Sequence, residues 1–130
     1  MSPKEFKGRG IEFVLDFFDC KCDRWKLTDG NLVVPEMIDI ITRSGLTFRK
    51  QALQEFSSED GAGSYSFACI LEESHLTGHA WPEFNYIALS AYVCHFNNDN
   101  TQRIIELVYM LEDFFKPARF VKKYVKRGEQ

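Results

Sequence analysis

The chain has 130 residues, of which 16 are basic and 19 acidic, giving a formal net charge of −3. A hydrophobic share of 45% with 27% charged residues is typical of one globular domain and excludes disorder as the main state. Because the balance is mildly acidic and no apolar run approaches the roughly 18 residues of a membrane span, we expect no nucleic-acid or membrane partner. The polar start of the chain predicts a cytoplasmic protein with free cysteine thiols.

The first half of the chain predicts two strands around one helix. Residues 11–18 form a β-rich apolar run and predict the first strand. Apolar residues at helical spacing predict a helix over 35–44, with a proline in its first turn. Residues 46–56 predict a second strand, and the Ser- and Gly-rich stretch 57–64 predicts a flexible turn.

The second half predicts two more strands, a long helix and a last strand. Residues 65–71 and 86–96 read as strands, and the connection 72–85 holds most of the polar and aromatic residues of interest. A wide apolar stripe predicts a helix over 101–116, which a proline then ends. Apolar residues within 120–125 predict the last strand.

This order, β-α-β-β-β-α-β, predicts an α+β fold in one domain spanning residues 1–130. The expected architecture is a two-layer α/β sandwich, an antiparallel sheet with two helices on one face. The other sheet face then lacks cover and is rich in aromatic residues. We therefore expect a homodimer.

The segment 72–83 holds the densest set of reactive side chains. His75 and His79 would share one face of a helix and could bind a metal there, but Gly78 and the flanking strand signals disfavour a helix. We therefore predict no metal site. An ordinary serine nucleophile at Ser74 served by His79 is also disfavoured, because no Gly-x-Ser-x-Gly elbow is present.

The same segment resembles the self-processing site of bacterial S-adenosylmethionine decarboxylase, a pyruvoyl-dependent family. The central resemblance lies in Glu73-Ser74-His75-Leu76-Thr77, His79, Trp81-Pro82-Glu83 and the later Cys94. Further matches are Asp16-Phe17-Phe18-Asp19-Cys20, Ser66 eight residues before the serine, and Arg127-Gly128 near the end. The resemblance covers essentially the whole chain and implies the family's two-layer sandwich and dimer.

The resemblance implies that the chain cuts itself between Glu73 and Ser74 into pieces 1–73 and 74–130. In that family the serine hydroxyl attacks the preceding carbonyl, and the resulting ester breaks by β-elimination. Hydrolysis then leaves a pyruvoyl group, a cofactor derived from Ser74 itself. His79 matches the proton relay of this processing, and Ser66 matches a second processing residue.

The resemblance also implies a substrate and a reaction. The pyruvoyl ketone would form a Schiff base with the amino group of S-adenosylmethionine, and Cys94 would return a proton after decarboxylation. Trp81 and Glu83 match the adenosine end of the site, and Phe56 is the nearest match to a stacking phenylalanine. The product would be decarboxylated S-adenosylmethionine, the aminopropyl donor for spermidine biosynthesis.

Two alternatives stay open at this point. A pyruvoyl-dependent enzyme could act on ornithine or arginine, with Glu83, Glu72 or Asp99 facing the distal cation. The chain could also be an unprocessed, non-catalytic relative that binds a nucleoside-like ligand. When each residue is considered alone, a structural interpretation is available: Cys94 as a core thiol, Ser66 as a solvent-facing hydroxyl and Trp81 as part of a packed turn.

Four positions depart from the family pattern and keep these alternatives open. Glu12 lies where a histidine is usual, Val93 and His95 flank Cys94 in place of Thr and Gly, and Gly78 replaces a bulky aliphatic residue. Because glycine adds backbone freedom, we expect Gly78 to loosen the loop that positions His79. Cys20 and Cys22 are assigned a structural role only.

Overall fold

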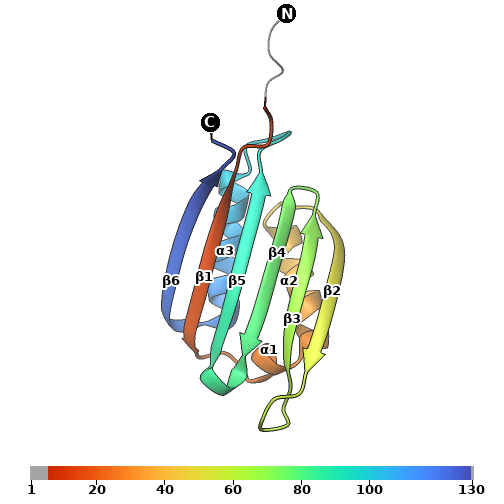
Figure 1. Cartoon of the computed structure of the whole chain (residues 1–130), viewed down its shortest axis with the longest axis vertical. Helices are drawn as coiled ribbons and strands as arrows, with labels where there is room; N and C mark the ends of the chain where they lie inside the picture. Colours follow the sequence, from red (N-terminus) through yellow and green to blue (C-terminus); the bar gives the residue numbers. More distant parts are fainter. Residues whose placement is uncertain (1–5, 130) are drawn as a thin grey trace, which may run out of the picture.

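The fold is an antiparallel six-stranded sheet with helices packed on one face. The computed structural model describes residues 6–129, so both ends of the predicted 1–130 domain lie outside the described residues. The elements are β1 (Gly10–Cys20), α1 (Trp25–Thr28), α2 (Gly30–Arg43), β2 (Phe48–Phe56), β3 (Ser64–Leu71), β4 (Ser74–Trp81), the 3-10 turn η1 (Pro82–Phe84), β5 (Tyr86–Cys94), α3 (Thr101–Phe115) and β6 (Pro117–Arg127). The strand order is β2-β3-β4-β5-β1-β6 (Figure 1). The predicted α+β class is confirmed.

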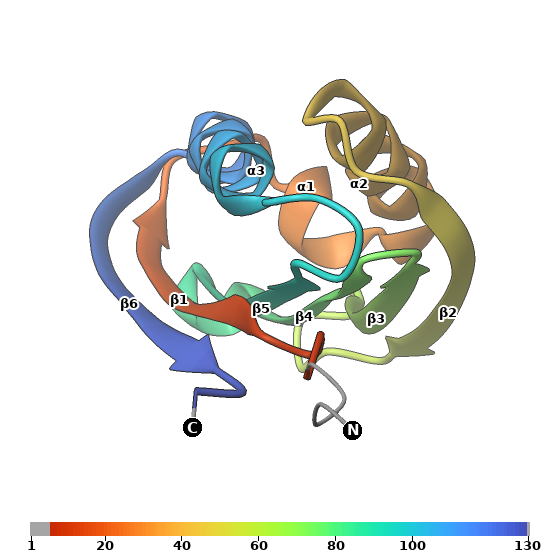
Figure 2. The same cartoon turned by 90° about the horizontal axis from the view of Figure 1, so that it is seen from above.

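The molecule has two layers, and the sheet curves around its helices (Figure 2). Strand residues alternate between the helix side and the opposite side, which we call the open face. In β5 the residues that point to the helices are all buried, namely Ile87, Leu89, Ala91 and Val93. The core therefore lies between the sheet and the helices, and the open face is left uncovered within one chain.

The helical part differs from the sequence prediction at its start. The four-residue α1 was not predicted, and α2 begins at Gly30 rather than near Pro35, which lies inside the helix. The cause is an N-cap, because a carboxylate oxygen of Asp29 accepts hydrogen bonds from the backbone N–H groups of Asn31 and Leu32 at 3.1 and 3.3 Å. The capping aspartate sets the start of the helix. By contrast, α3 covers Thr101–Phe115, as predicted.

The segment predicted as a connection over 72–85 instead contains β4. Its residues alternate, with Leu76, Gly78 and Ala80 buried toward the helices and the residues between them on the open face. Two of the three inward residues are very small, so the hydrophobic signal of the alternation is weak. The sheet therefore has six strands within the described residues instead of five.

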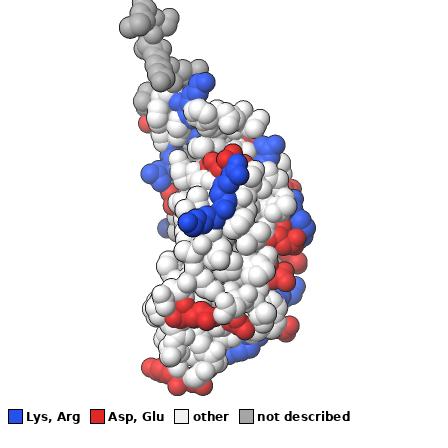
Figure 3. Space-filling model, turned by 90° about the vertical axis from the view of Figure 1, so that its right-hand side faces the viewer, with Lys and Arg blue, Asp and Glu red and all other residues white. Residues whose placement is uncertain are grey.

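Both edge strands carry exposed charged residues. Arg49, Lys50 and Glu55 lie exposed on β2, and β6 contains several exposed lysines. Charged side chains of both signs lie scattered over the side of the molecule that carries β2 (Figure 3). Such charges discourage pairing with the edge of another sheet. None of the helices in residues 6–129 has the length and apolarity that a bilayer crossing requires.

Gly78 occupies a position that the core fills from the opposite strand. It pairs with Phe67 across β3 and β4, and a Cβ added at Gly78 would collide with the Phe67 ring. The same Cβ would lie 2.9 Å from Cδ2 of Leu89. The expectation that Gly78 loosens a loop is therefore wrong, because the residue lies inside a paired strand and makes room for an aromatic ring.

The four cysteines, all within the described residues, are free thiols. Cys69 is completely buried and Cys20 is 7% exposed, whereas Cys22 and Cys94 are half-buried. Burial raises the pKa of the Cys20 thiol to about 12 and the pKa of the Cys69 thiol to about 11. The two buried thiols are thus protonated and shielded at neutral pH.

Replacing Gly78 by valine should destabilise the protein, because the added side chain has no room beside Phe67 and Leu89. Overpacking of this kind costs about 1–3 kcal/mol in the free energy of unfolding. Urea unfolding of Gly78→Val measures this cost, with Thr77→Val on the open face of the same strand as the control. Combining Gly78→Val with Phe67→Leu should restore part of the lost free energy of unfolding. An unchanged unfolding midpoint in Gly78→Val alone would contradict the packing argument.

Alkylation at pH 8 should distinguish the buried cysteines from Cys94 by their reaction rates, because the thiolate is the reactive form. We expect Cys20 and Cys69 to react with iodoacetamide far more slowly than Cys94 in the folded protein, as peptide mass mapping would measure. The raised pKa values also mean that the buried thiols contribute their full stability below their ordinary value of 9.0 and lose it as the pH rises further. Equal labelling of all four thiols before unfolding would rule this out.

Candidate active site

The Glu73–Ser74 bond lies in a tight turn between two strands. Leu71 is the last residue of β3 and Ser74 the first of β4, so only Glu72 and Glu73 make the connection. This turn lies at the end of the sheet where β5 ends and β1 begins (Figure 1). The position brings the bond next to the last residue of β5, which is Cys94.

Hydrogen bonds from two neighbouring strand ends hold Glu73. The backbone N–H of Cys94 donates to the carbonyl oxygen of Glu73 at 2.8 Å, and the N–H of Thr47 donates to the Glu73 carboxylate at 2.9 Å. The N–H of Glu72 donates in turn to the carbonyl of Thr47 at 2.9 Å. The Glu73 carbonyl is therefore both fixed in place and polarised by an N–H donor.

Ser74 has an unusual backbone conformation. Its φ of 155° is a value that residues other than glycine rarely adopt, and such conformations carry strain. The strain lies on the C-terminal side of the Glu73–Ser74 bond. The Glu73–Ser74 peptide bond therefore joins a carbonyl that is held by a hydrogen bond to a residue with a strained backbone.

Cys94 is positioned by a buried asparagine that the sequence analysis missed. Asn100 is 4% exposed, and its side-chain amide donates to the carbonyl oxygen of Cys94 at 2.8 Å. Arg103 donates to the Asn100 side-chain oxygen at 2.8 Å, and the Asn100 N–H donates to a ring nitrogen of His95 at 3.0 Å. A cavity of about 400 Å³ beside this network is lined by Glu73, Cys94 and Asn100, among others.

Ser66 and His79 form a hydrogen-bonded pair on the open face. The two residues are direct partners in the pairing of β3 with β4, and Ser66 Oγ lies 2.7 Å from His79 Nδ1. The distance allows a proton to pass between the hydroxyl and the imidazole. The ladder between the two strands therefore holds this pair in register.

The same pair borders a pocket at the far end of the sheet. This cavity of about 610 Å³, which we call the aromatic pocket, brings together five of the predicted site residues: Phe56, Ser66, His79, Trp81 and Glu83. Loop residues 57–59 line another part of its wall. Phe56 and Trp81 are 50% and 51% exposed, so both rings are open to a planar ligand.

The predicted site residues fall into two groups that lie far apart in one chain. Ser74 and His79 are at a separation of five residues along the extended strand β4, which corresponds to roughly 17 Å. Glu73, Ser74 and Cys94 lie at one end of the sheet, and the aromatic pocket lies at the other. Within a single chain His79 does not reach the Glu73–Ser74 bond.

The spacing of residues along β4 also argues against a metal site at His75 and His79. His75 and His79 both lie on the open face of β4, but four residues of strand separate them by roughly 13 Å. That distance is too long for two ligands of one ion. Among residues 6–129 no group of three His, Cys, Asp or Glu side chains is arranged to hold a metal.

Comparisons with known proteins bear on the family of this chain. A model of the S-adenosylmethionine decarboxylase family matches residues 11–128. The "S-adenosylmethionine decarboxylase proenzyme" of Acidithiobacillus ferrooxidans is 33% identical over 95% of this chain and 85% of the relative. The proenzyme of the same name from Methanococcus aeolicus is 30% identical over 94% of this chain and 96% of the relative.

The fold comparison points the same way. The crystal structure of the adenosylmethionine decarboxylase from Aquifex aeolicus superposes with a TM-score of 0.80, covering 96% of this chain and 95% of that chain. Its sequence identity is 18%, so this likeness bears on the fold. The family model and the two relatives carry the assignment itself. The chain therefore belongs to the S-adenosylmethionine decarboxylase family, a family of enzymes.

Proposed function

We propose that this chain is a precursor that cuts itself between Glu73 and Ser74 and becomes a pyruvoyl-dependent S-adenosylmethionine decarboxylase. The observation that carries the proposal is the hydrogen bond from the Cys94 N–H to the carbonyl of Glu73, directly before a strained serine. Cleavage there needs a hydroxyl on the following residue and a donor for the oxyanion. Both are present at this bond.

The proposed cleavage uses groups of the chain itself. Ser74 Oγ attacks the Glu73 carbonyl carbon, the C–N bond breaks, and the hydroxyl proton passes to the freed nitrogen while the Cys94 N–H stabilises the oxyanion. Loss of the Ser74 Cα proton then breaks the Cβ–Oγ bond and leaves a carboxylate on Glu73 and a dehydroalanine at position 74. Water replaces the nitrogen, which leaves as ammonia, and the new N-terminus is a pyruvoyl group.

A proton relay for these steps requires a second copy of the chain. Ser66 and His79 suit the task, but they lie roughly 17 Å from Ser74 in the same chain. The open face exposes apolar side chains, with Val14, Ile70, Val121 and Val125 between 42% and 54% exposed. We propose that two copies pair through their open faces, so that each supplies Ser66 and His79 to the bond of the other.

The aromatic pocket supports S-adenosylmethionine as the substrate. Phe56 and Trp81 offer rings for a purine, and the Glu83 carboxylate is an acceptor for both ribose hydroxyls. The pyruvoyl group supplies the carbonyl that draws electrons from the breaking carboxylate bond. Cys94, next to Ser74, would donate the proton to the product carbon. The product would be an aminopropyl donor for spermidine biosynthesis in the cytoplasm, where free thiols persist.

Mass spectrometry of the purified wild-type chain should find two pieces, 1–73 and 74–130. The second piece should be lighter by one ammonia than the same piece beginning with an intact serine. Ser74→Ala removes only the nucleophile, so this variant should fold and remain a single chain of 15.1 kDa. A wild-type chain that stays intact on incubation would instead favour the non-catalytic binding protein.

The cleaved protein then allows the substrates to be compared. We expect carbon dioxide release from S-adenosylmethionine and none above background from ornithine or arginine. The reverse order would favour the alternative amino acid decarboxylase. Glu83→Gln should weaken turnover of S-adenosylmethionine, because an amide accepts fewer hydrogen bonds than a carboxylate.

Mixing two inactive variants tests the shared site. Ser74→Ala lacks the nucleophile but keeps Ser66 and His79, whereas His79→Ala lacks the relay but keeps Ser74. Co-expression should restore cleavage of the His79→Ala chain, because its partner supplies an intact relay. Each variant expressed alone is the control, and a mixture with no cleavage above these controls would argue against a site built from two chains.

A further inference from the structure

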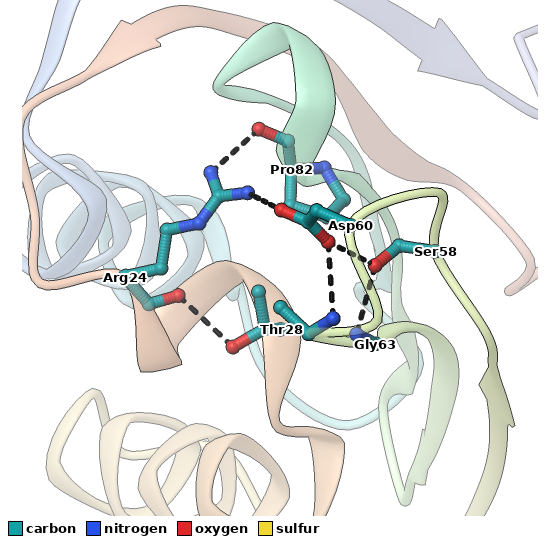
Figure 4. Close-up of polar contacts among 7 residues, drawn as sticks. Arg24, Thr28, Ser58, Asp60, Gly63 and Pro82 are labelled. Atoms are coloured by element: carbon teal, nitrogen blue, oxygen red, sulfur yellow. Dashed lines mark hydrogen bonds and ion pairs between the residues drawn. The ribbon is translucent and has the colours of Figure 1, made fainter.

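The side chain of Arg24 joins two segments that are far apart in the sequence, the turn η1 and the loop 57–63 (Figure 4). Arg24 lies at the N-cap position of α1, outside the residues that line the pocket. Its Nη1 donates to the carbonyl oxygen of Pro82 at 2.8 Å, and its Nη2 donates to a carboxylate oxygen of Asp60 at 2.7 Å. One guanidinium therefore contacts the turn η1 and the loop 57–63 at the same time.

Asp60 is also the organising residue of loop 57–63. Its other carboxylate oxygen accepts from the Ser58 hydroxyl at 2.6 Å and from the Ala62 N–H at 3.0 Å. The Ser58 oxygen in turn accepts from the Gly63 N–H at 2.8 Å. The loop is thus folded around the carboxylate that Arg24 holds, and its position follows that of Asp60.

Both segments contribute residues to the pocket wall, and both lie beyond the ends of the strand ladders. The pairing of β2 with β3 ends at Phe56 and Ser64, and the pairing of β4 with β5 ends at Trp81 and Tyr86. Ser57, Ser58 and Glu59 of the loop line the pocket, as do the two neighbours of Pro82. Ladder hydrogen bonds therefore do not fix the spacing between these walls.

We propose that Arg24 and Asp60 form a positioning latch that sets the spacing between loop 57–63 and Trp81–Glu83, and thereby the affinity of the aromatic pocket for the adenosyl end of the substrate. This inference rests on the proposed function. A planar, forked guanidinium can donate to two acceptors in fixed directions, which an ammonium on a flexible stem does not reproduce. Arg24 is a positioning residue, since it acts through Pro82 and Asp60.

The latch acts on substrate binding and leaves self-cleavage unaffected. Ser66 and His79 are held by direct pairing of β3 with β4 and by their own hydrogen bond. The Glu73–Ser74 bond lies at the other end of the sheet (Figure 1). Because both partners of the Arg24–Asp60 pair are about half exposed, the pair contributes little to overall stability. The effect of its loss therefore appears in the pocket.

The test compares Arg24→Ala, Arg24→Lys and Asp60→Asn with a matched control. Arg43→Ala removes an ion pair of similar length and exposure on α2, where Arg43 Nε lies 2.8 Å from Asp39. Arg24→Ala should raise KM for S-adenosylmethionine roughly tenfold with kcat little changed, the usual size for a lost hydrogen bond to a charged group. Arg24→Lys should recover only part of this loss, and Arg43→Ala should match the wild type.

A second measurement needs no enzymatic activity. Hydrogen exchange of residues 57–63 and 82–84 should quicken in Arg24→Ala and stay unchanged in Arg43→Ala, with thermal stability preserved in both. An unchanged KM in Arg24→Ala, or exchange in these segments no faster than in the control, overturns the latch. Cleavage of the wild-type chain is measured separately. A wild-type chain that is not cleaved would contradict the proposed function. The hydrogen-exchange result would then be the test of the latch.

Discussion

The register of β4 between β3 and β5 is the constraint on which the rest of the site depends. The same register that sets Ser66 opposite His79 also sets Ser74 opposite Val93, next to Cys94. A slip by one residue would turn every side chain of β4 to the other face of the sheet. Such a slip would separate the hydrogen-bonded pair and would draw the carbonyl of Glu73 away from the N–H of Cys94. Both ends of the site thus rest on one strand pairing.

Core packing on the helix side of β4 maintains that register. The ring of Phe67 fills the space that Gly78 leaves open, so the two residues fit only when they lie directly opposite each other. A bulky aliphatic residue at position 78 would need a smaller partner at position 67. Gly78 is therefore matched by Phe67 within the same strand pair, and the strand that carries His79 is closely packed at this point.

The sequence predicts those features of the structure that depend on residues close together along the chain. The helix α3 was predicted because its apolar stripe repeats over fifteen residues, and the site segment was found because its reactive residues are close in sequence. The strand β4 was missed because two of its three inward residues, Gly78 and Ala80, are very small and weaken the alternation. Arg24 acts through contacts that only the folded chain creates, because it reaches Asp60 and Pro82 across 36 and 58 residues. A pattern within a short stretch of sequence does not predict a contact between residues that are so far apart along the chain.

The division of the site between two ends of the sheet gives the proposed dimer a definite chemical role. A single chain holds the bond that we propose is cut and an N–H donor to its carbonyl, but it carries the hydroxyl–imidazole pair a strand length away. In a symmetric pair each open face meets the same face of the other chain, so one contact completes two sites. Cleavage would then be tied to assembly, and the aromatic pocket proposed for the adenosyl group would lie beside the ketone of the partner. In this arrangement the contacts of Arg24 with Asp60 and Pro82 come from the chain that carries the pocket, whereas the second chain would supply the pyruvoyl end.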